Sequence, residues 1–189
     1  MEVYIMQYLI GLAVVVVLIL LFGVSVYNGL VSLRNRVEEA FSTMDVYMKK
    51  RYDLIPNLVE TVKGYAKHES ETLDAVINAR NKAANASSDD ARIEAEGELG
   101  QVMGRLFALT EAYPDLKANT NFMDLQNQLQ TIETEIAQSR KYYNGSVRQY
   151  NTKREVFPSN IVANMFGFLR KPLFEVDSEV EREAVKVSF

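Results

Sequence analysis

The chain has 189 residues, of which 48% are hydrophobic, 24% are charged and four are proline, a composition typical of a folded domain rather than a disordered chain. It contains no cysteine, which excludes disulfides, cysteine-ligated zinc and thiol catalysis. Its net charge of −4 argues against binding of nucleic acid through global positive charge, so we expect no nucleic-acid partner.

The first element is an apolar run from Tyr8 to Tyr27, YLIGLAVVVVLILLFGVSVY, in which Ser25 is the only conventionally polar residue between the two tyrosines. About 20 helical residues cover a hydrocarbon core of roughly 30 Å, and tyrosine is enriched at both membrane interfaces. A cleaved signal peptide is the alternative, but Glu2 replaces the usual basic residues and no small-residue cleavage site follows. Residues 1–27 are therefore predicted to be an uncleaved transmembrane anchor.

Basic residues predict the orientation of this anchor. No lysine or arginine precedes the span, whereas Arg34 and Arg36 follow it closely. Because cytoplasmic flanks carry the excess of basic residues, we expect the N-terminus outside and the following domain in the cytoplasm.

Downstream of the span the apolar residues follow helical spacing, and no segment alternates as a half-buried strand would. The first helix is expected to continue to about Tyr52. Asp53 can then cap a new helix and Pro56 fits only a first turn, so the sequence predicts a break and a second helix that ends in the stretch NASSDD.

A third helix is expected after Ser88 or Asp89, either of which can cap it, and Tyr113-Pro114 closes it. A fourth helix begins near Asn121 and carries apolar and polar seam residues at heptad-like spacing. Four amphipathic helices with short connections bury their apolar faces most simply as an antiparallel bundle.

The predicted fold class is therefore all-α, with a transmembrane helix that continues into a long antiparallel four-helix bundle. Its parts are a transmembrane anchor at 1–27 (span 8–27), the bundle at 28–157, a short amphipathic and aromatic segment at 158–171 and an acidic tail at 172–189. The tail ends in AVKVSF, which can pair as an edge strand with another copy or cover a groove of the bundle.

The triplet Tyr-Asn-Gly occurs twice within helical patterns, at Tyr27 and at Tyr143. Equal helix lengths counted from the far end of the bundle place both triplets at its membrane-proximal floor. Their side chains are expected to provide polar packing, and their glycines to allow close helix approach. The candidate residues at this floor are Asn28, Gly29, Tyr143, Asn144 and Gly145.

The stretch YNGLVSLRNRVEEAFSTMDVYMKKRYDLIPNLVETVKGYAKHE, together with the later pattern YN, YN, FP, closely resembles the LemA family. One departure is Ile132-Glu133-Thr134, where the family pattern is closer to Thr-Glu-Asn. The resemblance implies a single-pass bacterial membrane protein with a helical bundle and no established catalytic activity. It also implies a link with membrane remodelling or with neighbouring membrane proteases.

The residues themselves predict no catalytic, cofactor or metal site. A di-iron bundle needs two Glu-x-x-His motifs, and the chain has one histidine, His68, which we expect on the surface. No serine lies in a nucleophile-elbow context. The acidic cluster Glu94, Glu96 and Glu98 alternates around its helix, so a solvated face is expected.

Positive charge is concentrated late in the chain, where residues 139–171 hold seven basic side chains and one acidic one, Glu155. The predicted topology returns this stretch to the bilayer, where each lysine or arginine near an anionic leaflet contributes about 1 kcal/mol. The candidate membrane-interface residues are Tyr8, Tyr27, Arg34, Arg36, Arg148, Lys153, Arg154, Phe157, Met165, Phe166, Phe168, Arg170 and Lys171.

Two interpretations of the aromatic segment after Pro158 remain open. Phe157, Ile161, Met165 and Phe166 can pack across the open end of the bundle as a cap, or they can lie in the membrane interface beside basic residues that face lipid phosphates. The acidic turn before the third helix is expected at the same end, and it argues against the second interpretation.

For function, the sequence favours a membrane-anchored cytoplasmic scaffold that self-associates, because polar seam residues can fix helix register and oligomeric state. The alternative is an adaptor or client-presenting partner of a membrane enzyme such as a membrane protease. Expected partners are the lipid bilayer, a second copy of the chain and, in the alternative, a membrane protein.

Overall fold

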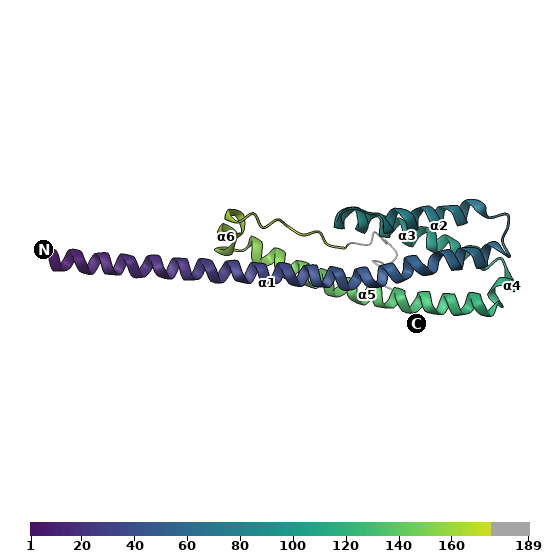
Figure 1. Ribbon diagram of the computed structural model, residues 1–189, viewed down its shortest axis with the longest axis horizontal. Coiled ribbons are helices and arrows are strands. Elements are labelled where there is room, and N and C mark those ends of the chain that lie inside the picture. Colours follow the sequence, from purple (N-terminus) through teal and green to yellow (C-terminus); the bar gives the residue numbers. More distant parts are fainter. Residues whose placement is uncertain (175–189) are drawn as a thin grey trace, which may run out of the picture. The chain divides into compact units, whose positions relative to one another are not determined.

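The computed structural model describes residues 1–174. The helices within this range are α1 Glu2–Lys63, α2 Ser70–Ala84, α3 Asp89–Thr110, α4 Pro114–Lys117, α5 Thr120–Glu155 and α6 Ser159–Met165 (Figure 1). No strand occurs in residues 1–174, and the prediction of an all-α fold is confirmed. The predicted tail segment AVKVSF lies outside the described residues.

The chain divides into two compact units. Unit 1 contains residues 1–41 and 142–173, whereas unit 2 contains residues 42–141 and Phe174. The two long helices α1 and α5 each contribute residues to both units. The remaining helices belong to one unit only: α2, α3 and α4 to unit 2, and α6 to unit 1.

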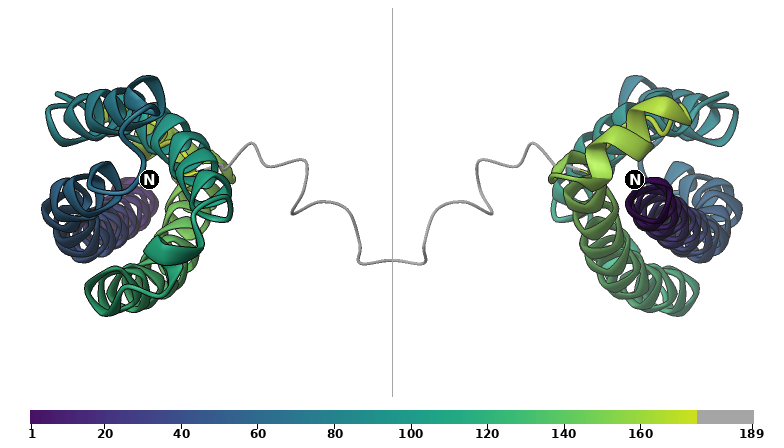
Figure 2. Two further views of the ribbon diagram at one scale, coloured as in Figure 1. Left: turned by 90° about the vertical axis from the view of Figure 1, so that its right-hand side faces the viewer. Right: turned by 90° about the vertical axis from the view of Figure 1, so that its left-hand side faces the viewer.

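Unit 2 contains four longer helical segments, which are the end of α1, the whole of α2 and α3, and the first part of α5, together with the short helix α4. The left view of Figure 2 looks along these longer segments. The side chain of Ser88 accepts a hydrogen bond from the Ala91 amide at 3.2 Å, which confirms the predicted cap of α3. Fully buried apolar side chains in this unit are Met44, Met48, Ile55, Val62, Val76, Leu99, Leu106 and Leu116.

The predicted helix break at Pro56 is wrong, because α1 continues through it to Lys63. A proline inside a helix has no N–H, so the carbonyl of Tyr52, four residues earlier, loses its helical partner. Arg80 of α2 supplies the missing donor, since its Nε lies 3.0 Å from the Tyr52 carbonyl oxygen. The second helix therefore begins only at Ser70, after an exposed turn that contains His68, as expected for a surface residue.

A buried ion pair connects three helices of unit 2. Arg51 of α1 is only 4% exposed; it binds Glu96 of α3, and its Nη1 lies 2.8 Å from Glu133 Oε1 of α5. The hydroxyl of Tyr52 also donates to Glu96. Because a buried charge that loses its partner is strongly destabilising, this network fixes the register of α1, α3 and α5.

Two expectations about acidic residues change accordingly. Glu96 is buried, which corrects the predicted solvated face; only its neighbours follow that prediction, with Glu94 exposed and Glu98 paired with Lys82 at 2.6 Å on the surface. The sequence departure around Glu133 leaves the glutamate itself in contact with Arg51.

In unit 1, α1 and α5 form an antiparallel pair. The rings of Phe41 and Tyr143 meet edge to face with centroids 5.6 Å apart, and Arg36 donates to Gln149 at 3.3 Å. In this register Tyr27 lies level with the C-terminal end of α5.

The predicted pairing of the two Tyr-Asn-Gly triplets is therefore wrong. Tyr143 lies level with Phe41, which is 14 residues beyond Tyr27, or about 21 Å along α1. The expected register counted α1 to Tyr52, but the helix extends eleven residues further, to Lys63. A Cβ added at Gly29 or Gly145 would meet nothing within 4 Å, so neither glycine serves close helix approach.

The other candidates for floor packing lie in different environments. Tyr143 is fully buried, Asn144 is half-buried and Asn28 is exposed on α1. The four-helix arrangement expected for all of residues 28–157 is present in unit 2, whereas unit 1 has two long helices with α6 and the segment after it.

Replacement of Arg80 by leucine should leave the Tyr52 carbonyl without a partner and lower the free energy of unfolding by about 1–3 kcal/mol. The same replacement should cost less in a Pro56→Ala background, because alanine restores the helical N–H. Chemical unfolding of the detergent-solubilised protein, followed by circular dichroism, measures this double-mutant cycle. Arg105→Leu, at an exposed arginine of α3, is the control. Equal costs in both backgrounds would contradict the assigned role of Arg80.

Candidate membrane interface

The first part of α1 is long and apolar enough to cross a membrane by its length and composition. The side chains of residues 1–22 are exposed, so no other part of unit 1 covers them. Tyr8 is exposed near the start of the apolar run, and Tyr27 is 37% exposed at its end. The helix continues without interruption beyond Tyr27, as predicted.

The chain turns back at the end of α5 and places α6 beside Tyr27. The ring centroid of Tyr27 lies 4.8 Å from that of Phe166 and 5.6 Å from that of Phe168, both edge to face. Figure 1 and the right view of Figure 2 show α6 lying against α1 and the end of α5. The buried Ser159 hydroxyl lies 2.6 Å from the Lys153 carbonyl oxygen, which ties the start of α6 to the last turn of α5.

Several apolar side chains of α6 and its flanks remain exposed. We call this set the α6 patch; its side chains are between 46% and 79% exposed, and they are Val156, Phe157, Ile161, Met165, Phe166 and Leu169. Within α6 the buried residues are Ser159 and Ala163. Of the four residues in the capping interpretation, Phe166 packs against Tyr27, whereas Phe157, Ile161 and Met165 are exposed.

The acidic turn that argued against a membrane role belongs to unit 2. In the first turns of α3, Arg92 binds Asp45 and donates to the Ala86 carbonyl oxygen of this turn at 3.3 Å. The α6 patch belongs to unit 1.

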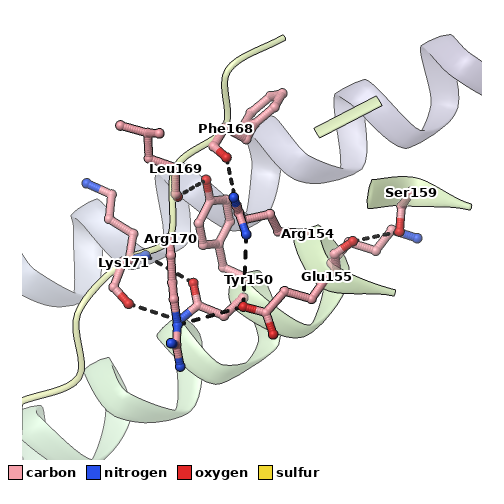
Figure 3. A network of polar contacts seen from close by, with 10 residues as sticks. Tyr150, Arg154, Glu155, Ser159, Phe168, Leu169, Arg170 and Lys171 are labelled. Carbon is pink, nitrogen blue, oxygen red and sulfur yellow. Dashed lines mark hydrogen bonds and ion pairs between the residues drawn. The ribbon is translucent and has the colours of Figure 1, made fainter. Parts of the chain in front are cut away.

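After α6 an extended segment, residues 167–173, runs back along α5; we call it the strap. It begins at Gly167, whose φ of +68° lies in the left-handed region that glycine adopts without strain. The Tyr150 hydroxyl donates to the Leu169 carbonyl at 2.8 Å, and Arg154 Nε donates to the Phe168 carbonyl at 2.8 Å (Figure 3).

Asn151 binds both backbone groups of one strap residue, Lys171. Its Nδ2 donates to the Lys171 carbonyl at 2.9 Å, and its Oδ1 accepts from the Lys171 amide at 3.0 Å. Further along, the Tyr143 hydroxyl donates to the Pro172 carbonyl at 2.9 Å. The repeated Tyr-Asn pattern of α5 therefore supplies hydrogen bonds to an extended backbone that has no sheet partner within residues 1–174.

Sequence reasoning missed this role. The polar seam of the fourth helix was expected to pack against other helices, yet Tyr150 and Asn151 bind the strap backbone. The available signal was a seam whose buried residues change from leucine and isoleucine to serine, tyrosine and asparagine after Ile136. Buried polar side chains need partners, and an irregular segment supplies them.

Several predicted interface residues contribute to the fold of unit 1 instead of facing outward. Phe168 is buried, the guanidinium of Arg34 lies 5.7 Å from its ring centroid, and Arg154 is engaged with its carbonyl. Arg36 is engaged with Gln149. These side chains hold α1, α5 and the strap together.

Other predicted cations remain accessible. Arg148 is exposed, Lys153 and Lys171 are half-buried, and Arg170 is exposed with its Nε 3.7 Å from Glu155. Residues 156–173 contain Arg170 and Lys171 and no acidic side chain. The structure thus brings Tyr27, Phe166 and Phe168 together and leaves a net positive segment beside them.

These features define a helical protein with one N-terminal helix fit to span a membrane. The sequence model of the LemA family matches residues 40–189, and the chain belongs to this family. The resemblance seen in the sequence is therefore confirmed.

Two kinds of relative are similar to the chain. Protein LemA of Metamycoplasma hominis is 28% identical over 162 residues, a match covering 85% of this chain and 74% of the relative. Magnetosome protein MamQ 2 of Paramagnetospirillum magneticum is 23% identical over 175 residues and covers 79% of the chain. Magnetosome protein MamQ of Magnetospirillum gryphiswaldense is 23% identical over 174 residues and covers 78%. The chain spans 64% of the length of each of these magnetosome proteins.

Removal of the Asn151 side chain should release the strap. Asn151→Ala removes two hydrogen bonds of about 1 kcal/mol each, so exchange of the Lys171 amide hydrogen should accelerate roughly 10- to 30-fold. Hydrogen exchange measured by mass spectrometry and tryptic cleavage after Arg170 both report this release. The exposed Asn78 of α2 provides the control, Asn78→Ala. Unchanged exchange in Asn151→Ala would show that the strap is held by other contacts.

Alkaline pH should weaken unit 1 through Tyr150. Burial raises the pKa of its phenol, while the charges of Arg154 and Arg34 act in the opposite direction. A raised folded-state pKa means that this contribution to stability is complete below the unfolded-state pKa of about 10 and is lost as the pH rises through the folded-state pKa. The unfolding midpoint should therefore fall less steeply above pH ~10 in Tyr150→Phe than in the unmodified protein. Tyr142→Phe, at an exposed tyrosine, should retain the original slope.

Proposed function

We propose that the protein is a membrane-anchored helical scaffold that self-associates in a bacterial cell membrane, with its N-terminus outside and both units in the cytoplasm. The observation that carries this proposal is the continuity of α1 from Glu2 to Lys63. Because the apolar run and the residues that follow it belong to one helix, the anchor continues directly into unit 1. Clustering of anchors then clusters the units.

The orientation is supported by Arg34 and Arg36, which follow the apolar run, while no basic residue precedes it. A role without catalysis is supported by the buried polar side chains, which bind other parts of the chain. Arg51 and Glu96 bind each other, and Asn151 binds the strap.

Self-association is supported by a polar stripe on the exposed side of α1. Its members follow steps of four, three and four residues and border a shallow groove; they are Asn28, Ser32, Asn35 and Glu39. Polar residues at such spacing fix the register and oligomeric state of paired helices. In two copies anchored with the same orientation in one bilayer, the α1 helices run in the same direction across the membrane. We therefore propose that the α1 helices pair in parallel.

Because the chain has no cysteine, one introduced thiol can test the pairing. Because cytoplasmic thiols are kept reduced, native membranes are isolated and treated with copper-phenanthroline as the oxidant. Ser32→Cys should then form a disulfide-linked dimer at ordinary expression levels. Ser87→Cys, at an exposed serine of the turn between α2 and α3, is the matched control and should remain monomeric.

If Ser32→Cys gives only monomer, and the detergent-extracted full-length protein has the size of one chain, self-association is wrong. A monomer that copurifies with a membrane enzyme would instead support the adaptor role that the family resemblance implies.

A further inference from the structure

We propose that the α6 patch is a second bilayer contact, in which its apolar side chains enter the lipid interface and the adjacent cations face anionic headgroups. This inference rests on the proposed membrane anchoring of α1 and is independent of self-association. It assigns a lipid ligand to a surface that the described part of the chain leaves uncovered.

Continuity with the anchor identifies the occupant of the patch. Tyr27 marks the end of the apolar run, and its ring touches Phe166 of the patch with centroids 4.8 Å apart. Tyrosines of transmembrane helices lie at the headgroup level. A bilayer that surrounds the apolar run therefore reaches α6, which lies beside Tyr27 in unit 1 (Figure 1).

The composition of the patch fits the interface. Large aromatic and aliphatic side chains dominate it, with Phe157 79% and Met165 73% exposed. Short amphipathic helices bind membranes by burying such an apolar face at the boundary between headgroups and acyl chains. Six large exposed apolar side chains within residues 156–169 are more than the scattered single ones of an ordinary surface, which favours an interaction site.

Internal contacts hold the patch in this orientation. Ser159 and Ala163 of α6 are buried, and Phe168, just after α6, is buried beneath the guanidinium of Arg34. The hydrogen bonds from Tyr150 and Asn151 then fix the strap to α5. The apolar face cannot turn inward without loss of these contacts, so it is preorganised for binding.

The charge beside the patch favours anionic lipid. Arg170 and Lys171 follow it, and no acidic residue occurs between positions 156 and 173. Glu155 lies 3.7 Å from Arg170 Nε and offsets part of this charge, leaving a positive balance.

The absence of tryptophan from the chain allows a direct test on the full-length protein. Phe157→Trp and Met165→Trp each place one tryptophan in the patch. Met123→Trp places one on α5 in unit 2, where Met123 is 41% exposed, as the matched control. Each variant is reconstituted into vesicles of phosphatidylcholine and phosphatidylglycerol in equal amounts, with and without brominated phosphatidylcholine.

We expect blue-shifted emission and a loss of fluorescence on bromination for both patch variants, with neither change for Met123→Trp. Replacement of phosphatidylglycerol by phosphatidylcholine, or the double substitution Arg170→Gln and Lys171→Gln, should weaken the quenching of the patch tryptophans. Circular dichroism verifies that every variant retains the helical content of the parent.

Red-shifted and unquenched emission at both patch positions would overturn the proposal. Blue-shifted emission without quenching by brominated lipid would also overturn it, because protein rather than lipid would then cover the patch. Equal quenching in neutral and anionic vesicles, unaffected by the double substitution, would overturn the claim that the adjacent cations face anionic headgroups. Crosslinking through Ser32→Cys in the same vesicles reports self-association separately, so failure of either proposal is distinguishable from failure of the other.

Discussion

The hydrogen bond from Arg80 Nε to the Tyr52 carbonyl is the contact on which the length of α1 depends. Pro56 has no N–H to donate to the Tyr52 carbonyl. An unpaired carbonyl at this position would favour termination of the helix. With Arg80 in place, α1 continues to Lys63. The long α1 is consistent with the antiparallel register of unit 1, in which Tyr27 lies level with the end of α5 rather than with Tyr143. That register places α6 beside the anchor.

Each unit uses a different kind of polar contact to fix its packing. In unit 2 the guanidinium of Arg51 on α1 binds acidic groups of α3 and α5. Because Arg51 is only 4% exposed, a shift of any of these three helices along its axis would leave a buried charge unpaired. In unit 1 the polar side chains of α5 bind backbone atoms of the strap, which would otherwise have no regular partners. The residues Arg51 and Tyr150, which lie in the stretches that resemble the family, therefore take part in the packing of two separate units.

The sequence predicted what is local and missed what depends on distant partners. The helical apolar run to Tyr27, the Ser88 cap and the helical spacing of α5 each depend on neighbouring residues, and all three are present. Pro56 was read as a helix start because its compensating donor is 24 residues away, at Arg80. Glu96 was read as solvated because its charge partner lies on α1. In the candidate interface, composition identified the aromatic segment, but only the contact of Phe166 with Tyr27 placed it beside the anchor.

A second lipid contact would change what the anchor can do. A single helix in a bilayer can rotate about its axis and tilt, so an anchor alone does not select which face of unit 1 is turned toward lipid. The α6 patch lies to one side of α1, and its burial in the interface would fix that rotation. The polar stripe of α1 does not include the side chains that face α5 and α6. With the rotation of α1 fixed, the stripe would point in one constant direction within the membrane plane. Two copies with fixed rotation lose less orientational freedom on pairing, because part of the ordering cost is already met by the lipid contact. Membrane docking and self-association would thus reinforce each other although they use different surfaces of unit 1.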